Sequence, residues 1–166
     1  MNRVRISALD KSVESVGFRC GQSAPDDYIA RYAAQDIRRN VARVFVATTP
    51  VAEPQRLAGF FSLSAGSVNC ADLPPLLAKK LPRYPVPVAR IGRLAVSLDF
   101  QGQGLGAVLL ADACQKVVLA SATLAVEGIV VDAKDGAAAS FYQRFDFLPL
   151  PGSVGCWLLP AAAFGA

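Results

Sequence analysis

The chain has 166 residues and a mass of 17.5 kDa, which is the size of one ordinary domain. Its hydrophobic share of 53% against 18% charged residues excludes a disordered chain, and the absence of histidine argues against a zinc site. No metal site is expected. The formal net charge of +4 permits a polyanionic partner such as RNA without requiring one.

We expect a single domain over residues 1–166 because no linker, repeat or low-complexity segment interrupts the sequence. The longest uncharged apolar run, Val117 to Val126, is too short to span a bilayer, and no export signal opens the chain. The cysteines are widely separated and form no Cys-x-x-Cys pair, so free thiols in a reducing cytoplasm are expected.

The first third of the chain reads as a strand, a helix and a hairpin. A short strand is expected around Val4 to Leu9, and Ser23 to Asp27 has the proline and acidic residues of a helix start. The helical spacing of Tyr28, Ile29, Tyr32, Ala33 and Ile37 predicts one apolar face. The helix should end at Arg38-Arg39-Asn40. Val44 to Thr48 and Leu57 to Leu63, joined by Pro50 to Arg56, predict two paired strands.

The middle third is rich in proline and basic residues. Ser64 to Ser67 is predicted to be a turn or bulge, Asp72 to Lys80 a short helix, and Leu81 to Pro87 a stiff extended connector. Basic residues cluster around this connector with Tyr84 between them: Lys79, Lys80, Arg83, Arg90 and Arg93. This pattern fits both a nucleic-acid-binding patch and ordinary surface charge.

Ile91 to Leu110 is the most informative stretch. An apolar strand to Val96 is followed by a polar turn, then by the glycine-rich loop Gln101 to Gly106, which opens a long apolar helix. In such a loop successive backbone N–H groups point outward beside the positive end of the helix dipole, which predicts an anion site, although three glycines alone also suit a plain turn.

The last third predicts an inner strand at Ile129 to Val131 and a helix from Gly136 to Phe145 capped by Asp135. Two short strands, Phe147 to Leu150 and Gly155 to Leu159, should end the fold.

The loop pattern Gln101-x-x-Gly104-x-Gly106 resembles the signature of the GNAT N-acetyltransferases. From about Ile6 to Leu159 the chain is similar to the GNAT-type toxins of bacterial toxin–antitoxin pairs. This similarity rests on Phe18-x-Cys20-Gly21, Asp26-Asp27-Tyr28, Arg43 to Ala47, Gly92 to Val96, and Phe141-Tyr142-x-Arg144-Phe145-x-Phe147. One departure is Asp146, where that family usually has glycine.

The resemblance implies an α/β (α+β) GNAT fold, in which helices flank a mixed central sheet whose strands 4 and 5 splay apart. It implies acetyl-CoA as cofactor, with pantetheine on the backbone near Leu94, Ala95 and Val96. The other residues that it implies for the cofactor are Gln101, Gly102, Gln103, Gly104, Leu105, Gly106, Asp135 and Phe145.

Tyr142 is the expected catalytic residue, because the resemblance places a tyrosine there as general acid for the leaving thiolate. On sequence grounds alone it also fits a core aromatic side chain. Glu53, Glu127 and Asp72 are possible general bases, but nothing in the sequence places them near a thioester. A base is dispensable for an α-amine, whose pKa of about 7.7 to 8.0 leaves a useful neutral fraction.

The implied substrate is the α-amine of aminoacyl-tRNA, and acetylation would stop translation. The expected tRNA-binding residues are Arg38, Arg39, Lys79, Lys80, Arg83 and Arg93. The implied partners are a ribbon–helix–helix antitoxin, through which DNA is reached indirectly, and a second copy of the chain. Two alternatives remain open: an acetyltransferase for a small amine or a protein N-terminus, and a binding subunit of an antitoxin complex with vestigial catalysis.

Overall fold

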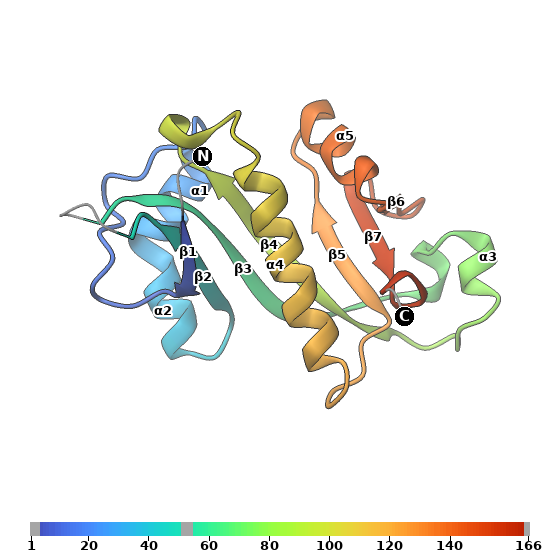
Figure 1. Ribbon diagram of the computed structural model, residues 1–166. Coiled ribbons are helices and arrows are strands. Elements are labelled where there is room, and N and C mark those ends of the chain that lie inside the picture. The colour runs from blue at the N-terminus through green and yellow to red at the C-terminus, as the bar shows by residue number, and fades with distance from the viewer. Residues whose placement is uncertain (1–3, 51–54, 165–166) are drawn as a thin grey trace. The chain divides into compact units, whose positions relative to one another are not determined.

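The computed structural model describes residues 4–50 and 55–164, which contain seven strands in the order β1-β2-β3-β4-β5-β7-β6 (Figure 1). The chain divides into two compact units. The first holds residues 1–64 and 92–113, the second residues 65–91 and 114–166, and each is described by itself. Strands β3 and β4 and helix α4 contribute residues to both units.

The first unit contains an antiparallel ladder. Strand β1 (Arg5–Ala8) pairs with β2 (Arg43–Thr48), and β2 pairs with β3 (Leu57–Val68), with a register shift between Ala47 and Thr48. The hairpin predicted from the two β-rich runs is therefore confirmed. Its predicted link includes residues 51–54, which lie outside the described residues.

A helical segment covers one face of this ladder (Figure 1). It begins as α1 (Ser23–Asp27), continues as a π-helical turn over Tyr28–Tyr32, and ends as α2 (Ala33–Arg38). Tyr28, Ile29 and Ala33 are buried in a core with Phe18, Val44, Val46, Leu57, Phe60 and Ala95. The prediction for Tyr32 was wrong, because its side chain is 52% exposed. A π-helical turn has more residues than an α-helical one, so the apolar spacing does not carry through it.

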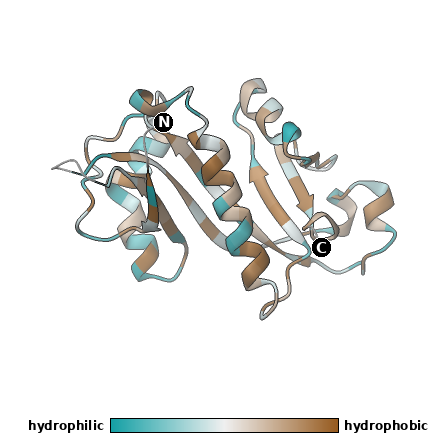
Figure 2. Cartoon of the chain, in the orientation of Figure 1, coloured by the Kyte–Doolittle hydropathy of each residue, from teal (hydrophilic) through white to brown (hydrophobic). Residues whose placement is uncertain are grey.

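The second unit is built around β5 (Gly128–Asp132), a buried strand in the hydrophobic colours of Figure 2. Residues Ala89–Ile91 of β4 (Val86–Val96) pair with β5 in parallel. On its other side β5 pairs antiparallel with β7 (Cys156–Pro160), which pairs with β6 (Leu148–Pro149). A mixed sheet is thus confirmed. The expected splay of strands 4 and 5 involves residues of both units and stays a prediction.

Two short helices belong to this unit, α3 (Pro75–Ala78) and α5 (Gly136–Arg144). Its core gathers apolar side chains from the strands and from the proline-rich segment: Val68, Leu73, Val86, Val88, Val130, Leu150 and Leu158. The predicted helix over Asp72–Lys80 is only partly confirmed, because a separate 3-10 turn occupies Cys70–Asp72.

The turn predicted as one alternative at Ser64–Ser67 was wrong, since β3 continues through these residues to Val68, and the other alternative, a bulge within the strand, stays a prediction. A methyl group added to Gly66 would lie 3.7 Å from both Val88 and Arg90, so this part of β3 packs against β4. Tertiary packing therefore overrides the weak strand propensity of these small residues.

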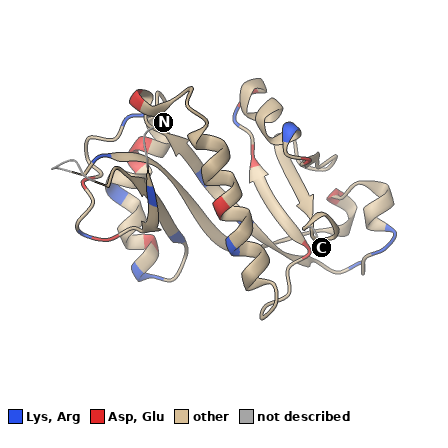
Figure 3. Ribbon diagram, in the orientation of Figure 1, with Lys and Arg blue, Asp and Glu red and all other residues tan. Residues whose placement is uncertain are grey.

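Helix α4 (Leu105–Ala120) begins where the glycine-rich loop predicts and carries few charges (Figure 3). No helix in the described ranges is both long and apolar enough to cross a bilayer. All four cysteines lie in the described ranges, and none of them forms a disulfide bond.

Candidate functional site

The glycine-rich loop is fixed to the first unit by its first residue. The side-chain nitrogen Nε2 of Gln101 donates to the carbonyl oxygens of Cys20 and Val96, at 2.9 Å each. These bonds tie the start of the loop to the end of β4 and to the segment that precedes α1. The amide of Gln101 thus organises the loop through its side chain.

Two glycines give the loop its shape. Gly102 and Gly104 have φ values of +78° and +82°, a region that other L-residues seldom adopt. A methyl group built at either position meets no atom within 4 Å, so the space over the loop is open on this side. The carbonyl of Gly104 accepts from the N–H of Val108 at 3.3 Å and starts helix α4. The first N–H groups of an α-helix have no partner within the helix, so this loop can receive an anion.

The last residues of β4 present a regular backbone edge. The N–H of Ser97, directly after β4, donates to the carbonyl of Ala58 on β3 at 2.8 Å. The carbonyl of Ala95 lies against Gly59, which is also on β3. Backbone groups of successive strand residues point to opposite sides. The N–H groups of Leu94 and Val96 therefore lie on the edge of β4 that faces away from β3.

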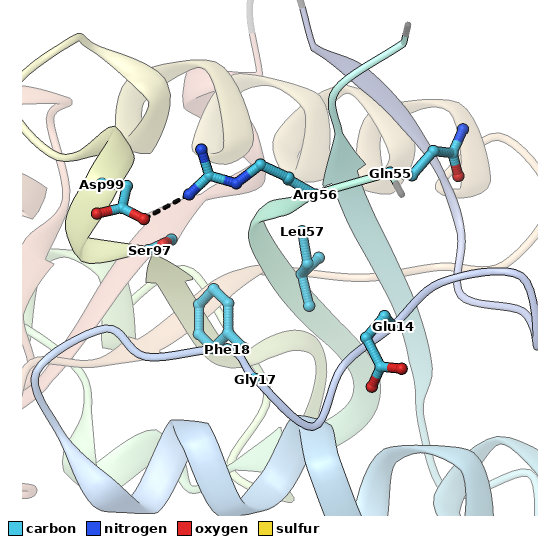
Figure 4. A pocket seen from close by; sticks show the side chains of 8 residues that line it. All are labelled: Glu14, Gly17, Phe18, Gln55, Arg56, Leu57, Ser97 and Asp99. Carbon is cyan, nitrogen blue, oxygen red and sulfur yellow. Dashed lines mark hydrogen bonds and ion pairs between the residues drawn. The ribbon is translucent and has the colours of Figure 1, made fainter. Parts of the chain in front are cut away.

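A pocket of about 200 Å³ adjoins the segment between β4 and the loop (Figure 4). Arg56, directly before β3, forms an ion pair with Asp99, and its guanidinium lies 5.2 Å from the ring centre of Phe100. Figure 4 shows this ion pair at the pocket, with Phe18 and Ser97 on the wall. These contacts connect the turn at Leu98–Phe100, which leads into the glycine-rich loop, to the residue that precedes β3.

Tyr142 lies in the second unit, on α5. It is buried, and its ring packs against Phe141 at 5.3 Å and Phe147 at 5.5 Å between centroids. Burial, with smaller contributions from Asp132 and Cys114, raises the pKa of Tyr142 to about 12. The phenol therefore keeps its proton throughout the neutral range.

The other predicted aromatic side chain, Phe145, is 38% exposed and lies 5.1 Å from the ring centre of Phe141. Asp146, which follows it, has a φ of +70°. This left-handed conformation, which glycine adopts most easily, is adopted here by aspartate, one of the few other residues that tolerate it.

Asp135 caps helix α5. Its backbone is extended, and its side-chain oxygen Oδ1 accepts from the N–H of Ala138 at 2.8 Å. The sequence prediction of an N-cap is confirmed. A role for this side chain toward a cofactor remains a prediction.

We expect Asp135→Ala to lower the free energy of unfolding by about 1 kcal/mol, the usual cost of losing an N-cap acceptor. Denaturant unfolding measures the change. Asp135→Asn, which keeps an acceptor at the same position, serves as the control, and equal stability of the alanine variant and the wild type would contradict the capping role.

Neither Glu127 nor Asp72, the two candidate bases within the described residues, contributes to the raised pKa of Tyr142. Glu127 directly precedes β5, at the opposite end of that strand from Asp132, and its N–H donates to the carbonyl of Pro87. Asp72 packs against Gly152, and Glu53 lies outside the described residues. The carboxylate that acts on Tyr142 is that of Asp132, which sequence reasoning missed. Its only sequence signal was its place as the first polar residue after the inner strand.

The predicted tRNA-binding residues fall into two groups. Lys79, Lys80 and Arg83 are exposed in the second unit beside Tyr84, itself 68% exposed. Arg38 and Arg39 lie at the end of α2 in the first unit, and both are exposed. Arg93 is exposed there too, and its guanidinium lies 3.8 Å from the ring centre of Tyr28. This stacking contact already engages the Arg93 side chain.

Residues 40–149 match the model of a family described as acetyltransferase (GNAT) domain. The chain is 36% identical, over 143 residues, to a tRNA-acetylating toxin of Mycobacterium tuberculosis (strain ATCC 25618 / H37Rv), and the match covers 86% of this chain and 81% of that protein.

Similar solved structures include AtaT complexed with acetyl-methionyl-tRNAfMet, at 27% identity and a TM-score of 0.89, over 97% of this chain and 96% of that one. AtaTR bound with AcCoA has 28% identity and a TM-score of 0.85, and the match covers 99% of this chain and 97% of that one. A mutant AtaT toxin bound to the C-terminus of the antitoxin AtaR and acetyl-CoA has 22% identity and a TM-score of 0.82, over 97% and 95%.

Proposed function

We propose, from the premise that the chain belongs to the GNAT acetyltransferase family, that it transfers the acetyl group of acetyl-CoA to the α-amine of an amino acid esterified to tRNA. The observation that carries this proposal furthest is the 36% identity to a tRNA-acetylating toxin across 86% of the chain. The product has no free α-amine for peptide elongation, so the enzyme acts as a toxin of translation.

The glycine-rich loop is the proposed site of the coenzyme diphosphate. Its open space, the positive φ of Gly102 and Gly104, and the start of α4 supply N–H donors and a favourable helix dipole for an anion. The pantetheine arm would bond to the backbone edge of β4 at Leu94 and Val96. An N–H near Val96 would then stabilise the oxyanion of the thioester.

Tyr142 is the proposed general acid. The neutral amine attacks the thioester carbonyl carbon, the C–S bond breaks, and the sulfur takes the phenolic proton. The nitrogen loses its proton as the amide forms, and that proton restores the phenol through solvent. With its pKa raised to about 12, the Tyr142 phenol stays protonated at neutral pH and can donate to the departing thiolate.

The basic residues supply the contacts to RNA. Lysine and arginine side chains neutralise phosphates, and an exposed aromatic ring such as that of Tyr84 can stack on a base. We assign Lys79, Lys80 and Arg83 this role, together with Arg38 and Arg39. Arg93 joins them through the part of its guanidinium that its stacking on Tyr28 leaves accessible.

The toxin is proposed to have protein partners and to act in the cytoplasm. We expect an antitoxin with a ribbon–helix–helix DNA-binding part, a homodimer, and the two compact units acting together as one acetyltransferase domain. Action on charged tRNA places the protein in the cytoplasm.

The test is incubation of the protein with radiolabelled acetyl-CoA and total tRNA, either aminoacylated or stripped of its amino acids. Label should appear on charged tRNA alone and should be released by mild alkali as an N-acetyl amino acid. Label on small amines or protein N-termini, with none on charged tRNA, would contradict the proposed substrate. Binding of an antitoxin with no transfer to any amine would favour a binding subunit.

A further inference from the structure

Three side chains from three neighbouring strands meet in the second unit. Asp132 ends β5, and its register partner Cys156 begins β7. The Cys156 thiol donates to Oδ1 of Asp132 at 2.9 Å, and Nη1 of Arg90, on β4, lies 3.3 Å from Oδ2. The carboxylate is thus held from both sides, each of its oxygens by a different strand.

The position of this cluster in the sheet is set by strand periodicity. Arg90, Asp132 and Cys156 are each two residues from a core side chain, namely Val88, Val130 and Leu158. Alternate residues of a strand share a face, so the cluster lies on the face that carries this core. The three polar side chains follow the core residues on that face, at the end of β5 from which the chain leads into α5.

The carboxylate is held without being closed off. The side chain of Asp132 is 54% exposed and that of Arg90 is 32% exposed. A carboxylate has about four lone-pair sites, and these neighbours use one on each oxygen. A further donor, such as an ammonium group, can therefore bind without displacing Cys156 or Arg90.

Asp132 is also within electrostatic reach of Tyr142, since its charge contributes to the raised pKa of that phenol. A cation bound at Asp132 would consequently lie in the surroundings of the proposed general acid. The cluster itself stands on hydrogen-bond and ion-pair geometry, independently of this effect.

We propose that the Asp132 carboxylate, oriented by Cys156 and Arg90, binds the α-ammonium group of the acceptor amino acid. This inference rests on the proposed function and adds to it the group that recognises the amine. The ammonium is held as a cation on arrival, and it releases its proton to solvent before nitrogen attacks the thioester. Asp132 is then a substrate-binding residue, and Arg90 and Cys156 are positioning residues.

The experiment compares two forms of one tRNA: an aminoacyl-tRNA that the wild type acetylates, and the same molecule after nitrous acid has replaced its α-amine by a hydroxyl group. Binding of each is measured to the CoA-loaded protein at pH 6.5, where an ordinary α-amine is mostly protonated. The wild type should bind the aminoacyl form about tenfold more tightly, a value at the low end for a charged hydrogen bond because the site is half exposed.

Asp132→Asn should abolish this preference and leave the affinity for the hydroxyacyl form unchanged, because the phosphate contacts remain. Asp132→Glu should restore part of it. Asp146→Asn removes one exposed carboxylate from the same unit, at a position whose positive φ asparagine accepts, and should behave as the wild type. If Asp132 had only a structural role, Asp132→Asn would weaken the binding of both tRNA forms equally.

An Asp132→Asn protein that folds and keeps the tenfold preference would overturn the inference while the proposed function stood. A wild type that acetylates no charged tRNA would defeat the proposed function instead, and this is read before any variant. Thermal unfolding checks each protein. Should Asp132→Asn not fold, Asp132→Ser carries the test, since it also removes the carboxylate, and a retained tenfold preference in that variant would overturn the inference.

Discussion

Tyr142→Phe is expected to lower kcat for acetyl transfer by about 10² to 10⁴, the usual contribution of a positioned general acid. The substitution removes one hydroxyl group and keeps the ring that packs against Phe141 and Phe147. The affinity for acetyl-CoA and the melting temperature should therefore change little. Steady-state kinetics with charged tRNA, together with calorimetric titration of CoA, separates the chemical step from binding.

The matched control is Tyr32→Phe, which removes a hydroxyl group from a tyrosine that is 52% exposed in the first unit. It should retain the wild-type rate. A Tyr142→Phe protein with wild-type kcat would show that the phenol donates no proton in the rate-limiting step.

Replacing Lys79, Lys80 and Arg83 together by alanine should produce the second large effect. The plot of log K against log salt concentration has a negative slope, and each lost phosphate contact makes this slope less steep by about 0.7 to 0.9. Losing three contacts should therefore reduce its magnitude by about 2 to 3. At low salt the affinity for charged tRNA should fall by about a hundredfold, while acetyl-CoA binding is unaffected. Filter binding over a series of salt concentrations measures both quantities.

The control removes the same net charge elsewhere, by alanine at the exposed residues Arg5, Lys11 and Arg31 of the first unit. If both triple variants lose affinity and slope equally, the effect is one of overall charge and the proposed tRNA contacts at Lys79, Lys80 and Arg83 are wrong.

The sequence was most informative where structure is decided locally. The strand, loop and helix of Ile91–Leu110 were predictable because glycine spacing and apolar pattern act within a few residues. The capping of α5 by Asp135 is local in the same sense, since the acceptor and the N–H that it receives are three residues apart.

Features that depend on register between strands were not predictable. Asp132, Cys156 and Arg90 are far apart in the sequence, and only the β4–β5–β7 pairing brings them together. Likewise, the position of Arg93 over Tyr28 depends on how the segment after Gly21 packs on the sheet. The position of Arg93 in a run of basic residues did not predict its contact with the Tyr28 ring.

For the proposed chemistry, one molecule of coenzyme must engage the glycine-rich loop and Tyr142 together. A crystal structure of the protein with acetyl-CoA tests this most directly. We expect the diphosphate on the N–H groups that follow Gly102 and Gly104, and the thioester sulfur within hydrogen-bonding distance of the Tyr142 hydroxyl. A diphosphate bound elsewhere, or a Tyr142 hydroxyl directed away from the sulfur, would contradict it.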